Sequence, residues 1–415
     1  MATVKPFKAI RPNEAVADQV AALPYDVYSR AEAYEAVKGH PLSFLNIDRP
    51  ETQFAPDIDM YADYVYDKAH DMLAAQIADG TYVQDDTPCY YIYELVMDGR
   101  HQVGLAACSS VDEYQNGTIK KHENTRADKE ADRIHHVDTV NAQTGPIFLA
   151  YRAVPEISAL IASIMSSQAP MNDFVSEDGI AHRVWKVSDA ATVATIEKLF
   201  AEKVPCTYIA DGHHRAASAV RVAERRRKAN PNYDGTEEFN SFLSVLFADE
   251  TLMIMPYNRV VKDLNGMSSE EFMAKVAECF TIETVGKTAV SPCAKNTYGM
   301  YLDDCWYKLT LKPELSNDDA VEGLDVSLLQ NYLLAPILGI ADPKTDKRID
   351  FVGGIRGTAE LERRCHADGK VAFSMYATSI AELFGVADAN KLMPPKSTWF
   401  EPKLRSGLLI HQLDK

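Results

Sequence analysis

The run TYIADGHHRAASAV, residues 207–220, gathers side chains that could bind an anion. Its polar centre lies between a short β-rich run and an alanine-rich helical run, and such strand-to-helix junctions bind phosphates. Gly212 lets the main chain turn tightly, the new helix offers unpaired amide groups, and Arg215 adds a planar cation. His213 and His214 add further donors. The pattern predicts a site for a phosphate-type anion.

The alternative interpretation of this turn is a helix cap, in which Asp211 accepts backbone amide protons and the histidines lie on the surface. A metal ion held by a protein cage is not expected here. Adjacent residues such as His213 and His214 point about 100° apart on a helix, and no H-x-x-x-H pair accompanies them. Mg²⁺ would arrive with nucleotide phosphates and would need one carboxylate, for which Asp211 is the candidate.

A second polar run, residues 119–151, contains a group of side chains suited to acid–base chemistry. Most of its charges suit a solvated helix face. The segment KHENT, which begins at Lys121, instead lies between a predicted hairpin and a helix, where loop residues can reach a cleft. Glu123 is therefore the candidate general base, with His122 as a catalytic neighbour. Lys121 and Arg133 are candidate cleft residues.

Three further segments could line the same cleft, and for each the alternative is a purely structural turn. The C-terminal run at 392–410 has a stiff Pro-Pro pair before three polar residues. FVGGIRG at 351–357 has a glycine pair suited to close backbone approach, and LPYDVYS at 23–29 has an acid after a bend. The candidates from these segments are Lys396, Ser397, Thr398, Gly353, Gly354 and Asp26.

The elements that must position these residues alternate between helices and strands. Asp98-Gly99 between two β-rich runs is a strong hairpin signal, and apolar residues at helical spacing predict a helix over 57–79. The apolar run at 42–47 predicts a strand, and a helix is expected at about 155–167. This mixture is typical of an α+β (mixed α/β) fold in which mixed sheets are flanked by helices.

The chain of 415 residues is long enough for two or three substructures. We expect an N-terminal and central α+β region at 1–265, which carries the KHENT and DGHHR motifs. A C-terminal α/β region at 266–415 would carry the FVGG and MPPKST segments. Neither region contains a low-complexity linker, so the boundary is soft.

The bulk composition excludes several classes of protein. Hydrophobic residues make up 46% and charged residues 25% of the chain, and no apolar stretch has the length of a membrane span. The N-terminus lacks the pattern of an export signal, so we expect a cytoplasmic protein. The seven cysteines contain no C-x-x-C pair, which argues against a disulfide framework and a structural zinc. A net charge of −17 makes nucleic acid an unfavourable partner.

Blocks along the whole chain resemble a known family. PYDV, HPLSFLNIDRPE, KHENT, ADGHHRAA, NRVVKDLNG, FVGG and MPPKSTWFEPK follow one another with compatible gaps. They look like the signature blocks of the domain of unknown function 1015 family of bacteria and archaea, some members of which are labelled transcriptional regulators. The resemblance runs nearly end to end and names no reaction.

The DGHHR block also resembles the phosphate-binding motif of the ParB/sulfiredoxin superfamily, which includes free-serine kinases. This local resemblance implies a ParB/sulfiredoxin-like core around the strand-to-helix turn. Gly212, His213, His214 and Arg215 would hold nucleotide phosphates, and Asp211 would position the substrate hydroxyl or magnesium. A glutamate serves the substrate hydroxyl in those kinases, and Glu123 is assigned to that task here on its chemistry. The alternatives to Glu123 are Glu14, Asp26, Glu32 and Glu51.

Three functional hypotheses follow. The leading one is an ATP- or ADP-dependent kinase that uses Mg²⁺ and phosphorylates the hydroxyl of a small metabolite, most concretely free L-serine. The second is a ParB-like, nucleotide-gated, DNA-binding transcriptional regulator, for which the basic run at 225–228 is the support. The third is a metal-dependent phosphatase or nuclease.

Overall fold

Two compact units make up the chain, and the computed structural model describes residues 1–125 and 127–414 of it. Unit 1 consists of Met1–Leu252 and Pro402–Lys415, and unit 2 consists of Met253–Glu401. The division therefore lies before the expected boundary at residue 265. The end of the chain also belongs to unit 1, whereas the sequence suggested a continuous C-terminal region.

Backbone pairing holds the C-terminal segment in unit 1. β21 (His411–Gln412) pairs with β7 (Ala142–Gln143), and Ile410 forms a bridge with Ile10. These pairs satisfy main-chain groups that would otherwise be buried without partners. They join segments that are far apart in the sequence, which is why composition and turn signals did not place the segment correctly.

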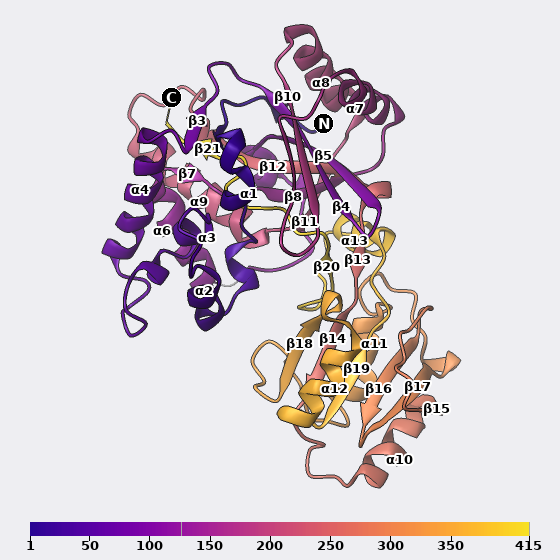
Figure 1. Cartoon of the computed structure of the whole chain (residues 1–415). Helices are drawn as coiled ribbons and strands as arrows, with labels where there is room; N and C mark the ends of the chain where they lie inside the picture. The colour runs from indigo at the N-terminus through magenta and orange to yellow at the C-terminus, as the bar shows by residue number, and fades with distance from the viewer. Residues whose placement is uncertain (126, 415) are drawn as a thin grey trace. The chain divides into compact units, whose positions relative to one another are not determined.

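A nine-stranded mixed sheet forms the centre of unit 1 (Figure 1). Its order is β6-β11-β8-β12-β5-β4-β10-β9, and β1 pairs with β5. The pairs β6/β11 and β8/β12 are parallel, and the others are antiparallel. The strands are β1 (Val4–Lys5), β4 (Tyr90–Met97), β5 (Arg100–Ser110), β6 (Ile119–Lys120), β8 (Ile147–Tyr151), β9 (Asn172–Val175), β10 (Ala181–Val187), β11 (Thr207–Asp211) and β12 (Ser241–Ala248). Every residue of β12 is buried, and its apolar residues come in consecutive runs around Ser244 rather than alternating with polar ones.

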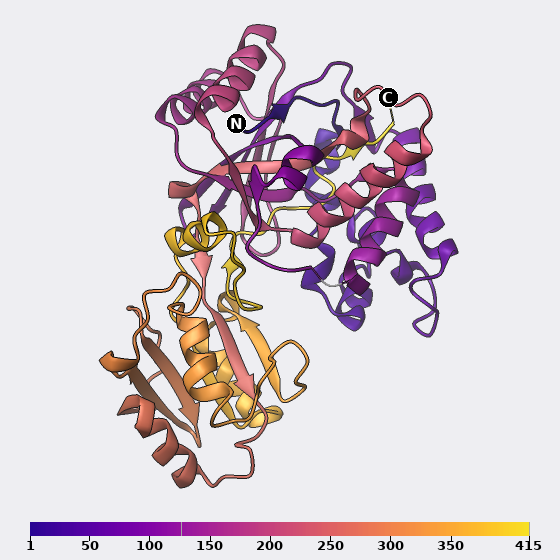
Figure 2. The same ribbon diagram turned by 180° about the vertical axis from the view of Figure 1, so that it is seen from behind.

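Helices of unit 1 pack around this sheet. Two views show α4, α6 and α9 side by side (Figures 1 and 2). Ala216, Ala219 and Ala223 of α9 belong to the buried core, against which Ile134 and Val137 of α6 pack. The helices are α1 (Ala17–Val20), α2 (Arg30–Ala36), α3 (Leu45–Asp48), α4 (Asp63–Ala78), α5 (Val111–Asn116), α6 (Ala127–Val140), α7 (Pro155–Ser167), α8 (Ala190–Lys203) and α9 (His213–Ala229). No helix among the described residues combines the length and the apolar character that crossing a bilayer requires.

Local signals predicted several of these elements, but the helix expected over 57–79 begins only at Asp63, and the strand expected at 42–47 is absent. Asp98 and Gly99 both have positive φ and join β4 to β5, as the hairpin signal required. The predicted strand at 42–47 is instead the helical turn α3. Its residues are buried on all sides, and a short apolar run does not distinguish a strand from a buried helical turn.

Unit 2 is built on a six-stranded antiparallel sheet with the order β15-β17-β16-β19-β14-β18. A separate two-stranded ladder pairs β13 with β20. The strands are β13 (Ile254–Met255), β14 (Tyr257–Val261), β15 (Phe280–Gly286), β16 (Thr297–Leu302), β17 (Cys305–Leu311), β18 (Ile349–Gly353), β19 (Val371–Ser374) and β20 (Trp399–Phe400). The helices are α10 (Ser269–Cys279), α11 (Asp325–Leu329), α12 (Gly357–Ala367) and α13 (Ile380–Asp388). Helices and sheets in both units confirm the α+β class.

Candidate functional site

The DGHHR turn lies where β11 ends and α9 begins. Gly212 occupies the position before the helix with φ of 94°, in the left-handed region that favours glycine. A Cβ atom at this position would lie 3.0 Å from the Nε and Nη2 atoms of Arg215. The left-handed backbone of this turn therefore favours glycine, and the guanidinium of Arg215 packs closely over it.

Two cations surround the carboxylate of Asp211. Lys403 Nζ donates to Asp211 Oδ2 at 3.1 Å, and Arg215 Nη2 lies 3.6 Å from the same oxygen. Burial alone would raise the pKa of Asp211, but Lys403 and Arg215 outweigh burial and hold that pKa well below its usual range. Arg215 Nη1 also donates to the carbonyl of Pro146 at 2.5 Å, which fixes the guanidinium. Asp211 is thus an anion with two neighbouring cations at the N-terminus of α9.

The loop between β6 and α6 brings His122 and Glu123 beside His213, the first residue of α9. The rings of His122 and His213 meet edge to face with centroids 4.5 Å apart. One ligand atom from each of the three side chains lies within 4.8 Å of the others. The sequence predicted the KHENT and DGHHR motifs separately, and the fold joins them into one cluster.

Both histidines of this cluster are almost fully buried, with His122 2% and His213 7% exposed. Burial lowers the pKa of His122 to about 4, although the backbone of Ile209 and the charge of Asp211 oppose the shift. Burial and His122 lower the pKa of His213 well below its usual value. Both imidazoles are therefore neutral at pH 7, and the positive charge at this site comes from the lysine and arginine side chains.

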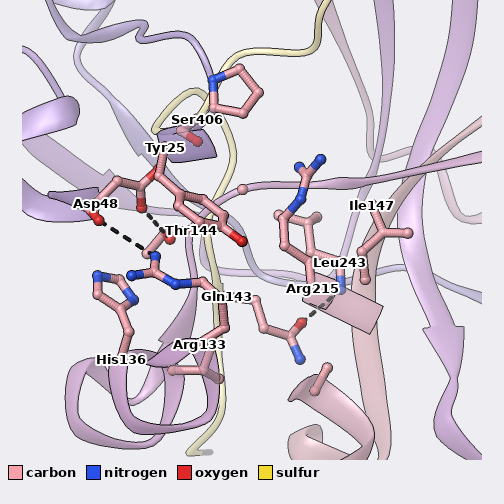
Figure 3. A pocket seen from close by; sticks show the side chains of 14 residues that line it. Tyr25, Asp48, Arg133, His136, Gln143, Thr144, Ile147, Arg215, Leu243 and Ser406 are labelled. Atoms are coloured by element: carbon pink, nitrogen blue, oxygen red, sulfur yellow. Dashed lines mark hydrogen bonds between the residues drawn. The ribbon is translucent and has the colours of Figure 1, made fainter. Parts of the chain in front are cut away.

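A small polar pocket lies on another side of Arg215 (Figure 3). Arg133 spans it, with its guanidinium 4.0 Å from the centre of the Tyr25 ring and its Nη1 3.4 Å from the Asp48 carbonyl. Thr144 Oγ1 donates to Asp48 Oδ1 at 2.8 Å. The cavity measures about 30 Å³, which is the volume of roughly one water molecule. This volume is far smaller than that of a nucleotide.

The remaining candidates in unit 1 lie at the edge of this arrangement. Lys121 is exposed, with its Nζ 4.5 Å from the centre of the Tyr114 ring. Asp26 is also exposed, and its neighbour Tyr25 lines the pocket in its place. The carbonyl of His214 accepts from Ser218 Oγ at 2.7 Å within α9.

Four of the five candidates in unit 2 have structural contacts inside that unit. A Cβ atom on Gly353 would lie 2.8 Å from the Trp399 ring, so glycine allows this close packing. Ser397 is buried, and its Oγ donates to the Pro394 carbonyl at 2.7 Å. The Lys396 carbonyl accepts from Arg259 Nη2 at 3.1 Å. Similar packing applies to Gly354, and the ligand role of these residues and of Thr398 stays a prediction.

Sequence reasoning missed Lys403, Tyr25, Asp48 and Thr144. Lys403 is the most informative of them because it contacts Asp211 from a distance of 192 residues along the chain. A signal was present, since Lys403 closes the block MPPKSTWFEPK. The prediction instead selected Lys396, Ser397 and Thr398, which stand earlier in that block.

Acidic partners occupy the arginines of the basic run at the end of α9. Arg226 Nε donates to Asp138 Oδ1 at 3.0 Å, and Arg227 Nη1 donates to Asp112 Oδ1 at 2.6 Å. Arg225 Nη1 lies 3.7 Å from Asp138 Oδ2. Much of the cationic charge that the DNA-binding hypothesis required is therefore neutralised within the protein.

Comparisons with known proteins give one family and several distant structures. A family model described as "Protein of unknown function (DUF1015)" matches residues 4–327. No curated protein matches the chain.

A mutant free serine kinase in complex with AMP is 11% identical with a TM-score of 0.38, covering 78% of this chain and 92% of that chain. SbnI with a C-terminal truncation from Staphylococcus aureus is 12% identical with a TM-score of 0.40, covering 74% of this chain and 87% of that chain. A conserved hypothetical protein from Pyrococcus furiosus is 13% identical with a TM-score of 0.35, covering 74% and 94%.

Proposed function

Because this chain belongs to the DUF1015 family, whose description names no activity, we propose a function from the chemistry of the chain's own site. The proposed activity is a nucleotide-dependent kinase that transfers a phosphoryl group to the hydroxyl of a small metabolite. Free L-serine is the first acceptor to test. The observation that carries the proposal is the ionised Asp211 held between Lys403 and Arg215 at the start of α9.

The start of α9 is suited to nucleotide phosphates. The first turn of a helix presents amide groups without intrahelical partners and the positive end of the helix dipole. Arg215 adds a guanidinium that can bind two phosphate oxygens at once, and Lys403 adds a second positive charge. Phosphoryl transfer needs mainly positioning and neutralisation of the transferring group, and these groups supply both.

The acceptor hydroxyl needs a different group. A carboxylate that two cations hold as an anion is a weak proton acceptor, so Asp211 suits the Mg²⁺ of the nucleotide or the orientation of the hydroxyl. Glu123 lies beside His213 and is the proton acceptor in this proposal, with His122 as its neighbour. ATP and ADP are both candidate donors.

Phosphorus NMR on the full-length protein tests the proposal. ATP or ADP with Mg²⁺ and L-serine should yield phosphoserine, and Arg215→Ala should lower kcat/KM by about 100-fold or more, the usual loss when a donor to transition-state charge is removed. The matched control is Arg225→Ala, which removes an exposed arginine from the same helix and should leave the rate unchanged. A hydroxyl-metabolite screen in which neither nucleotide gives a phosphorylated product would refute the kinase.

The same assay separates the competing hypotheses. Release of inorganic phosphate without an acceptor would favour the phosphatase. Duplex DNA should not bind even at low salt, because the arginines at the end of α9 already pair with acids. A salt-dependent mobility shift would favour the regulator instead.

A further inference from the structure

We propose that His122, Glu123 and His213 bind one divalent transition-metal ion, as a site made entirely of protein ligands. The ion would be distinct from the Mg²⁺ that accompanies a nucleotide. This inference concerns the cluster itself and goes beyond the proposed kinase activity. It also departs from the sequence-based expectation, which considered only the adjacent pair of histidines in the DGHHR motif.

Two buried nitrogen atoms point to a missing partner. Among the described residues, His122 Nδ1 and His213 Nε2 are buried polar atoms without a hydrogen-bond partner. A buried polar group left unpaired costs about 1–3 kcal/mol, so proteins retain few of them. Here two occur in rings that touch each other, and the Glu123 carboxylate lies within 4.8 Å of both. A cation at the centre would give both nitrogen atoms a partner at once, with the Glu123 carboxylate as a third ligand.

The other nitrogen of His122 is already engaged. His122 is hydrogen-bonded to the backbone of Ile209, a residue of β11. Nδ1 has no partner among the described residues, so a bond to this backbone would come from Nε2. The lone pair of Nδ1 is then available. Metal-binding histidines are commonly held by a bond of this kind, which fixes both the tautomer and the direction of the ring.

The donor set selects the class of ion. Two imidazoles and one carboxylate suit Zn²⁺, Mn²⁺, Fe²⁺ or Co²⁺, whereas Mg²⁺ and Ca²⁺ prefer oxygen ligands alone. Three protein ligands leave coordination positions open for an oxygen of a phosphate or an acceptor. A carboxylate bound to a cation accepts protons weakly, so with the ion in place Glu123 would act as a metal ligand rather than as the proton acceptor of the proposed kinase.

Titration of the full-length protein with Co²⁺ and Zn²⁺ tests the site without nucleotide. The protein is first stripped with a chelator, and binding is followed by the visible absorption of Co²⁺ and by calorimetry. We expect one equivalent per chain. His213→Leu and His122→Leu should each weaken binding by more than the roughly 10–100-fold loss typical of an outer-shell partner. His70→Leu, which removes an exposed histidine on α4, is the matched control and should retain one equivalent.

Wild-type protein that takes up no Co²⁺ or Zn²⁺ would overturn the proposal. So would a His122→Leu/His213→Leu double variant that binds as tightly as wild type. Circular dichroism melting of each apo variant checks that it folds. If a histidine variant does not fold, Glu123→Gln on the half-buried loop replaces it, with the same loss of affinity and a changed Co²⁺ spectrum expected. Because no nucleotide is present, failure of the kinase would not affect this result.

Discussion

The Lys403–Asp211 ion pair should contribute measurably to stability as well as to binding. Lys403→Met keeps most of the apolar stem and removes the charge, so we expect a loss of about 1.5–3 kcal/mol of unfolding free energy at pH 7. The native pKa of Asp211 is lowered, so this contribution is present above the unfolded pKa and is lost as pH falls through the native value. Urea denaturation over a series from pH 7 down to pH 1.5 measures it. Lys403→Arg is the control, and a difference that does not shrink towards the acid end of this range would contradict the assignment.

Single side chains could be predicted from the sequence where they stand close together in the chain. The residues from Asp211 to Arg215 are contiguous, and the structure keeps them in one turn. Lys403 and His122 reach the same turn only through the tertiary fold. A local sequence pattern does not show which strand ends next to which loop. Sequence spacing therefore could not reveal Lys403 beside Asp211 or the contact between the His122 and His213 rings.

The β9–β10 hairpin contains a buried histidine that should make stability pH-dependent. His182 is fully buried, and its Nε2 accepts from Arg405 Nε at 3.2 Å. Burial and the Arg405 charge lower its pKa to about 3. The unfolded chain therefore binds the proton first, and unfolding free energy should fall as pH drops from about 6.5 to 3, by up to about 5 kcal/mol.

Denaturation curves of wild type and His182→Phe, recorded across this pH range, isolate the effect. The phenylalanine variant should lose less stability on acidification, because it has no imidazole to protonate. Carboxylates titrate equally in both proteins, so only the difference between the two curves counts. Parallel curves would show that His182 is not held neutral in the native hairpin.

Elements with strong local signals could be predicted, and elements defined by their surroundings could not. Ser29 and Glu32 have the spacing of a capping box and form one at the start of α2, and Asp98-Gly99 closes its hairpin. The second half of the run at 42–47 folds as the buried helical turn α3, and Ser43 Oγ accepts from the Leu45 amide just before it. Because all residues of α3 are buried, the sequence lacks the alternation of apolar and polar residues that distinguishes a helix from a strand.

Unit 1 should fold without unit 2, because the two chain segments at the boundary of unit 2 pair with each other. Met255 lies opposite Trp399 in the antiparallel ladder of β13 and β20. Replacing residues 256–398 by Asn-Gly would close this ladder as a two-residue hairpin. We expect a cooperative thermal transition and native circular dichroism. A chain ending at Glu401, which lacks the strand that pairs with β7, should not fold.

Nucleotide affinity of the shortened protein tests the predicted ligand residues of unit 2. If the site of unit 1 is sufficient, calorimetry should give an affinity close to that of wild type. A large loss would instead assign a binding role to Lys396, Ser397, Thr398 or the glycine pair. Failure of the shortened protein to fold would show that unit 1 depends on unit 2.

The return of the chain end to unit 1 also orders events during synthesis on the ribosome. All of residues 253–401 must be translated before Lys403 exists, and until then Asp211 lacks one of its two cations. A nascent chain can therefore form the DGHHR turn early. The second cation beside Asp211 is added only when the segment from Pro402 onward has been synthesised. Chains released early would carry the motif without its lysine, so completion of translation itself becomes a condition for a finished site.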